Sequence, residues 1–267
     1  MQFNIEASLT YDFSAPCEVL LLVEASHGRG QTVSAEALTF WPPVKTTRID
    51  DAVTGERRTV FAATGRVNAL YRATVEVSPL DHDFRNAPET SVHHLSGDTL
   101  AYLRASRYSP SDRLMRFAER EFGDLRGGAK VGAIVAWIAS HVDYQTNVSH
   151  SATTAVDTFI DRAGVCRDFS HLVIALSRAA NIPARAVSAY AWGLDPPDFH
   201  AVAEVYLGGR WWLIDATGMA RTENLVRVAT GRDAADIAFL TSQFNCQCLA
   251  QTIKVSRAPE DAGLQAA

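Results

Sequence analysis

The sequence predicts an α+β fold, in which an N-terminal antiparallel β-sandwich domain precedes a domain of helices packed on an antiparallel sheet. Three observations lead to this prediction. Apolar and polar side chains alternate along residues 1–85, as they do in half-buried strands. From residue 111 the apolar spacing is helical, and after residue 184 the strand pattern returns. Helices followed by strands within one domain are typical of the α+β class.

The N-terminal strand pattern is clearest in residues 69–77, where Tyr71, Ala73, Val75 and Val77 share one face and Arg72, Thr74 and Glu76 share the other. Residues 51–59 place Asp, Thr, Gly and Glu between two β-rich runs, which predicts a hairpin. Residues 79–98 are rich in Pro, Gly, Asp and His, the composition of a linker. We therefore expect the sandwich domain to occupy residues 1–85 and to carry no catalytic residue.

The second domain is expected to cover residues 86–256. Its predicted elements are helices after residue 111, at 131–142 and from Cys166, then strands at 185–192 and twice within 201–214. The third helix should end near Asn181, because the Ile-Pro pair that follows disfavours a further turn. Residues 257–267 are polar and small, which predicts a flexible tail.

Length and composition place the chain among soluble globular proteins. It has 267 residues, enough for about two domains, and 47% of them are apolar while 21% are charged. A chain of this size buries a sizeable core without disulfides or metals. The formal net charge of −5 gives no reason to expect nucleic acid or an anionic membrane as a partner.

The compartment predicted from the sequence is the cytoplasm. The first residues lack the basic start and apolar run of a secretory signal, and no apolar stretch approaches the ~20 residues that span a bilayer. The four cysteines, Cys17, Cys166, Cys246 and Cys248, do not form an evenly spaced disulfide framework. In a reducing compartment we expect them to be thiols.

Cys166 is the candidate nucleophile, because it lies in the first turn of the third predicted helix. Gly164 permits the sharp backbone entry that places it there. Unpaired N–H groups and the helix dipole favour an anion at such a position, and a thiolate is the nucleophilic form of cysteine. The same N–H groups can stabilise a developing oxyanion. Asp168, two residues later, is interpreted as a residue whose negative charge stabilises the first turn of the helix.

His200 and Asp215 are predicted to meet on one face of a hairpin. Gly208-Gly209 is a two-residue turn signal, which pairs Leu207 with Arg210. In that register, positions 200 and 215 are diagonal neighbours on one face, roughly 7–8 Å apart at the backbone. A turn longer by one residue would put them on opposite faces. With the two-residue turn, His200 would act as the base for Cys166, and Asp215 would orient the imidazole.

Four segments carry a resemblance to a known family: GVCRDFSHL, NIPARAVSAY, DFHAVAEVYL and WWLIDAT. Together they resemble the transglutaminase-like superfamily, whose members have Cys, His and Asp in the same chain order. The similar stretch runs from about Tyr102 to Val255. YLR with SRY near residue 105, and GRDAAD near residue 233, are similar to bacterial members in particular. Such members often carry an N-terminal β domain, in agreement with the first 85 residues.

The resemblance implies a papain-like core with a Cys–His–Asp triad at Cys166, His200 and Asp215. It implies hydrolysis or acyl transfer at an amide through a thioester, with a peptide, a protein or a small amide as substrate. Protein cross-linking is not implied. The acyl acceptor, the substrate and the oligomeric state stay open at this point.

Two positions depart from the family pattern. Many members have Trp two residues after the histidine, where this chain has Val202. The upstream aromatic or amide side chain that completes the oxyanion hole in relatives has no clear match, and Tyr144 and Gln145 are the candidates. Glu204 shares the predicted face of His200, where it either lines the cleft or pairs with a cation. These departures concern substrate preference more than the triad.

Two other functions compete with this one. A non-catalytic module would use the cleft to hold a peptide or a partner, although such modules usually lose one triad residue. A metal-dependent hydrolase would use His93-His94 and Asp81-His82-Asp83, but a polar linker favours solvated side chains. Cys246 and Cys248 lack C-x-x-C spacing and a nearby histidine. We therefore expect no metal and no cofactor.

Overall fold

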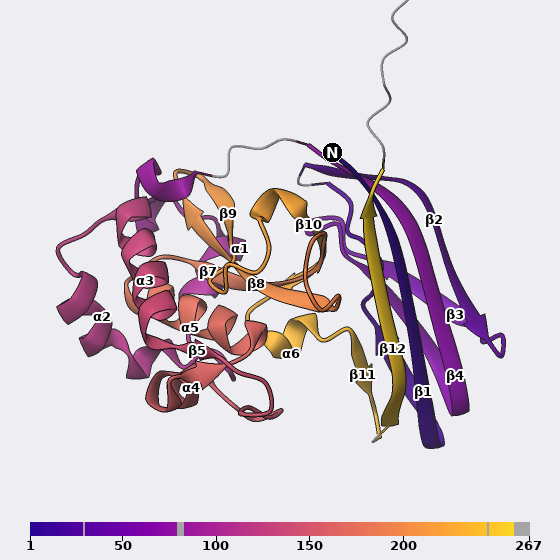
Figure 1. Cartoon of the computed structure of the whole chain (residues 1–267). Helices are drawn as coiled ribbons and strands as arrows, with labels where there is room; N and C mark the ends of the chain where they lie inside the picture. Colours follow the sequence, from indigo (N-terminus) through magenta and orange to yellow (C-terminus); the bar gives the residue numbers. More distant parts are fainter. Residues whose placement is uncertain (29, 79–82, 245, 259–267) are drawn as a thin grey trace, which may run out of the picture.

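A computed structural model describes residues 1–28, 30–78, 83–244 and 246–258. It consists of a β-sandwich beside an α+β domain (Figure 1). The predicted fold class is thereby confirmed. Among the described residues, every helix is too short or too polar to cross a bilayer.

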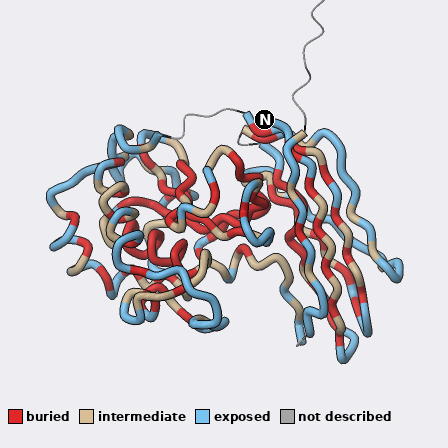
Figure 2. The backbone as a smooth tube through the Cα atoms, viewed as in Figure 1, coloured by how far each residue is buried: buried red, intermediate tan, exposed pale blue. Residues whose placement is uncertain are grey.

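The sandwich is built mainly from two long strands that pair along their whole length. Its N-terminal strands are β1 (Gln2–Leu21), β2 (Gln31–Trp41), β3 (Thr46–Asp50) and β4 (Arg57–Val77). The antiparallel β1–β4 register shifts once, between Phe13 and Cys17. β2 pairs with the second half of β4 and β3 with the first half. Buried and exposed positions alternate along β1 and β4, so one face of each strand enters the core (Figure 2).

The paired strands double back to form two layers. Phe40 on β2 pairs with Ala69, and Phe61 lies eight residues before Ala69 on β4. Along a straight strand these positions would be about 26 Å apart. The ring centroids of Phe40 and Phe61 are 4.9 Å apart. The strands therefore bend near the register shift and pack on themselves, which is one of the ways a sandwich makes its corners.

The last strands of the chain also belong to the sandwich. Both β11 (Leu240–Ser242) and β12 (Cys246–Arg257) pair antiparallel with β1. The predicted second domain, 86–256, is therefore wrong over its last 17 residues, and Arg257 ends a strand instead of starting a tail. The physical reason is that the free edge of β1 offers N–H and C=O groups that need partners. The rest of the predicted tail, 259–267, lies outside the described residues.

The α+β domain places its helices against a four-stranded antiparallel sheet in the order β10-β7-β8-β9. Its helices are α1 (Gly97–Leu100), α2 (Met115–Phe122), α3 (Gly127–His141), α4 (Ala155–Asp161), α5 (Cys166–Ala179) and α6 (Ala234–Ile237). Its strands are β5 (Asp143–Tyr144), β6 (Ala163–Gly164), β7 (Ala184–Ala191), β8 (Phe199–Leu207), β9 (Arg210–Ile214) and β10 (Leu225–Gly231). The helices predicted at 111, 131 and Cys166 correspond to α2, α3 and α5.

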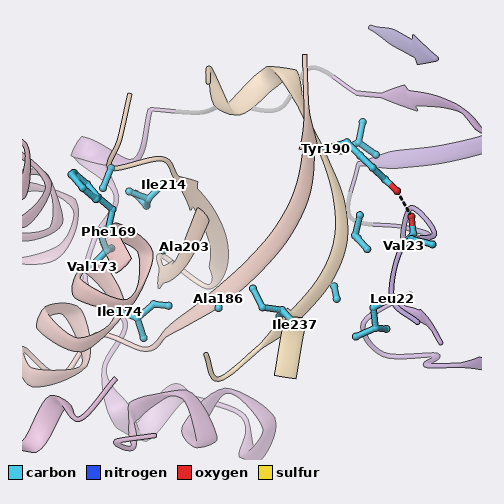
Figure 3. Packing of buried hydrophobic residues seen from close by; sticks show 14 of the residues in the cluster. Leu22, Val23, Phe169, Val173, Ile174, Ala186, Tyr190, Ala203, Ile214 and Ile237 are labelled. Carbon is cyan, nitrogen blue, oxygen red and sulfur yellow. Dashed lines mark hydrogen bonds between the residues drawn. The ribbon is translucent and has the colours of Figure 1, made fainter. Parts of the chain in front are cut away.

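Helix α5 is the centre of this domain. Its apolar side chains Phe169, Val173 and Ile174 face Ala203 of β8 and Ile214 of β9 in the close view of the core (Figure 3). Val173 and Ile174 have no exposed surface. A helix buried on this scale is held by its packing, so its first residue is placed rigidly against the sheet.

Polar contacts join the two domains. The amide of Gln31 donates to the carbonyl of Arg227 and accepts from its N–H, both at 2.9 Å. The hydroxyl of Tyr190 on β7 donates to the carbonyl of Val23 at 2.6 Å, as the dashed line in Figure 3 marks. All four partners are buried. Separation of the domains would therefore break these buried hydrogen bonds.

Tyr190→Phe is expected to lower the free energy of unfolding by about 1–3 kcal/mol, because the buried Val23 carbonyl loses its donor. Urea unfolding followed by circular dichroism measures the change. Tyr206→Phe, at a half-buried position on β8, is the matched control and should change stability by less than about 0.5 kcal/mol. Equal unfolding midpoints for the Tyr190 variant and the parent would contradict this assignment.

Candidate active site

Cys166 is the first residue of α5, as predicted, and Val165 is the N-cap. The Asp168 carboxylate accepts a hydrogen bond from the Val165 N–H at 2.9 Å, which closes the first turn. A Cβ on Gly164 would lie 2.7 Å from the Cβ of Asp168, so the close approach requires glycine. Asp168 is fully buried and also accepts from Arg167. Its role is thus to shape the helix start, while Cys166 stays partly exposed.

Ser170 ties the start of α5 to the strand that carries the histidine. Its hydroxyl lies 2.8 Å from the carbonyl oxygen of Cys166 and 2.8 Å from that of Ala201. One hydroxyl proton is thereby shared between the carbonyl of Cys166 and that of the residue after His200. No periodicity in the sequence predicts this contact, because Ser170 belongs to a helix face that is already buried.

The β8–β9 hairpin brings His200 and Asp215 together. Leu207 pairs with Arg210 as predicted. Gly208 and Gly209 have φ values of 58° and 81°, the positive values that a type I′ turn needs at both positions. The Nε2 atom of His200 lies 2.9 Å from Oδ2 of Asp215.

The Asp215 carboxylate is held by four donors. Oδ1 accepts from the N–H and the hydroxyl of Thr217, at 2.9 and 2.6 Å. Oδ2 accepts from the N–H of Ala220 at 2.9 Å and contacts His200. Burial opposes ionisation of the carboxyl, but the hydrogen bonds to its charged form outweigh burial, and the pKa of Asp215 is lowered. Asp215 is therefore a fixed anion behind the imidazole.

His200 is 2% exposed, and burial alone would favour its neutral form. Interactions with Asp215 and with Cys166 outweigh burial and raise the pKa of His200 to about 9. Since Asp215 contacts Nε2, the other ring nitrogen, Nδ1, is the one available to the thiol. His200 therefore contacts Asp215 directly, and Cys166 is close enough to influence the pKa of the imidazole.

Tyr144 and Gln145 lie beside the start of α5. β5 pairs parallel with β6, which sets Tyr144 opposite Gly164, and the Gln145 N–H donates to the Gly164 carbonyl at 2.9 Å. The Tyr144 ring lies 5.9 Å from that of Phe169, one turn along α5. Burial, with Cys166 and Asp198 nearby, raises the pKa of Tyr144. Both candidates are thus next to the helix N-terminus.

Glu204 does not line the cleft at Cys166. It is fully buried, and its carboxylate accepts from the Nε atoms of Arg185 at 2.7 Å and Arg227 at 2.9 Å. The Arg185 guanidinium also lies 3.8 Å from the ring centroid of Trp211. Of the two possibilities left open by the sequence, pairing with a cation is the one found. A buried carboxylate needs cationic partners, and the two arginines supply them.

No group of three His, Cys, Asp or Glu side chains gathers in metal-ligand geometry within the described ranges. His93 and His94 lie in a short exposed turn. Asp81 and His82 of the linker lie outside the described residues. The four cysteines are free thiols. The histidine-rich linker therefore supplies no metal site in the part of the chain that the structure describes.

Comparisons with known proteins agree with this geometry. Residues 115–216, which include Cys166, His200 and Asp215, match the model of the transglutaminase-like superfamily. A candidate cysteine protease from Cytophaga hutchinsonii has a solved structure that is 36% identical in sequence, covers 96% of this chain and 90% of its own, and superposes with a TM-score of 0.88. An uncharacterized protein from Mycobacterium leprae is 30% identical over 149 residues. That match covers 51% of this chain and about half of the relative's length, 52%.

Proposed function

Because the chain belongs to the transglutaminase-like superfamily, we propose that it is a cysteine-nucleophile hydrolase or acyltransferase that acts on an amide. The observation that carries the proposal is the contact of His200 with Asp215, next to a partly exposed cysteine at the start of a buried helix. The similarity to a candidate cysteine protease supports an amide as the bond attacked.

In the proposed reaction Nδ1 of His200 holds the proton that Cys166 has given up, and the thiolate of this ion pair attacks the amide carbonyl. The oxyanion forms near the first N–H groups of α5, with Tyr144 or Gln145 as the further donor. His200 then returns the proton to the departing amine, which leaves a thioester on Cys166. Water or an amine attacks the thioester and releases the enzyme.

Asp215 acts through the imidazole. Its contact with Nε2 fixes the ring so that Nδ1 faces the thiol, and its charge stabilises the imidazolium that forms. The substrates that fit this chemistry are a peptide, a protein glutamine or a small amide. A partly exposed nucleophile is accessible to an extended chain, which favours a peptide or a protein.

The test of the proposal is alkylation of Cys166 by iodoacetamide, followed by mass spectrometry. At pH 6, well below the pKa of about 8.5 of a free thiol, the parent should react about tenfold faster or more than His200→Ala. The exposed Cys248 in the same molecule provides an internal reference. Equal labelling of Cys166 in both proteins would exclude an activated thiol and favour the binding-module alternative.

Turnover is expected to fall as pH rises through about 9. The pKa of His200 is raised to about 9, so the imidazolium that protonates the leaving amine is present below this pH and is lost above it. The pH dependence of kcat on a fluorescent casein substrate measures this limit. An alkaline limit near pH 6.5, the value of an unperturbed histidine, would contradict the assigned hydrogen bonds.

A further inference from the structure

The residue before His200 is held by a segment outside the family match. The Phe199 ring stacks on Phe239, with centroids 4.7 Å apart and planes 12° apart. Phe239 lies between α6 and β11, beyond the matched residues 115–216. Its carbonyl accepts from the N–H of Leu22, which directly follows β1. A residue of the returning chain therefore touches the start of the histidine strand.

This stack is the end of a row of four rings, Tyr71, Tyr190, Phe199 and Phe239, which we call the aromatic row. Centroid separations along it are 6.3, 5.2 and 4.7 Å. Tyr71 belongs to the sandwich, and its hydroxyl accepts from the N–H of Ala25 at 3.0 Å. The row thus runs from the sandwich core to the residue next to the imidazole.

A second contact restrains the same place. The amide of Gln251 on β12 donates to Oδ1 of Asp198, and the Phe199 N–H donates to that oxygen at 2.7 Å. Asp198 and Phe199 are the two residues that precede His200. Both are therefore held by side chains that approach from the last segment of the chain.

We propose that Phe239 and Gln251 are positioning residues for His200. This inference rests on the proposed function. His200 is only the second residue of β8, and Tyr190–Phe199 is the last pair of its ladder with β7. Strand ends open more readily than strand centres, so the imidazole needs support on this side. Catalytic geometry tolerates about 0.5 Å, and a 1 Å displacement can cost about 100-fold in rate.

The first test compares Phe239→Leu with Phe40→Leu by the iodoacetamide rate of Cys166 at pH 6. Both residues are half-buried and pack against another phenylalanine, but Phe40 does so inside the sandwich, against Phe61. Phe239→Leu should lower the rate by about tenfold, within the range that a small displacement causes. Phe40→Leu should leave it at the parent level. Equal rates in the two variants would overturn the inference.

A double-mutant cycle shows whether Phe239 acts through His200. In a His200→Ala background, Phe239→Leu should have no further effect on labelling. A full tenfold loss there would mean a general structural effect and would overturn the inference. If His200→Ala alone leaves the parent rate unchanged, the proposed function fails instead, so the two failures are distinguishable.

Gln251→Ala tests the second contact and does not disturb the core, so it decides the question if Phe239→Leu fails to fold. Loss of one hydrogen bond to Asp198 should lower the labelling rate about threefold. Gln247→Ala, at an exposed position of the same strand, is the matched control and should match the parent. Equal rates in Gln251→Ala and Gln247→Ala would overturn the role of Gln251.

Discussion

Replacing Cys166 by alanine is expected to lower kcat for amide cleavage by about 10⁶-fold, the loss seen when a hydrolase loses its nucleophile. His200 and Asp215 then have no bond-forming partner, and the residual rate comes from binding and the N–H groups of α5. The fold should be unchanged, because the residue is partly exposed and alanine is a strong helix former. Release of fluorescent peptides from labelled casein measures the rate.

Cys248→Ala is the control for this result. It removes an exposed thiol on β12 and should keep the parent rate. Mass spectrometry of the protein with substrate should reveal an acyl adduct in the parent and in Cys248→Ala, and none in Cys166→Ala. Turnover that survives in a clean Cys166→Ala sample would disprove the cysteine mechanism.

Asp215→Asn is expected to lower kcat by about 10⁴-fold, the size of effect known for such a change in a Ser–His–Asp triad. The asparagine keeps the shape of the side chain but removes the charge that stabilises the imidazolium. Since hydrogen bonding and charge from Asp215 help to raise the pKa of His200 to about 9, the alkaline limit of the pH profile should move down. The pH dependence of kcat on labelled casein, compared between the parent and Asp215→Asn, measures both effects.

Asp236→Asn is the matched control for the aspartate. Asp236 is also an anion with several donors, since Arg232 donates to it from its N–H at 2.8 Å and from its guanidinium. It lies on α6 and does not contact the site residues named above. Its replacement should leave kcat within about twofold of the parent. A loss in Asp236→Asn as large as that in Asp215→Asn would assign the effect to stability.

The parts of the site that the sequence predicts depend on short-range rules. Gly164 and the helical spacing after it place Cys166 at a helix start, and the paired glycines set the hairpin register. Each of these signals lies within one element or one turn, where sterics and periodicity determine the geometry. The same rules identify Asp168 as part of the first helical turn.

The parts that the sequence does not predict depend on contacts between distant segments. Residues 246–257 form a strand in the structure, and alternation along a segment carries no information on which sheet edge that strand joins. Gln251 and Phe239 therefore give no sign of their contacts near His200. Glu204 shows the same limit, because alternation gives its face while the two arginines that bury it come from other strands.

The return of β11 and β12 to β1 makes the α+β domain an insertion within the sandwich. During synthesis on the ribosome, one edge of β1 therefore stays open while roughly 160 further residues are added, on the order of 10–30 s at typical elongation rates. Open strand edges pair readily with other chains. The nascent chain is thus most exposed to misassembly in this interval, and a chaperone that covers β1 would raise the yield of folded protein.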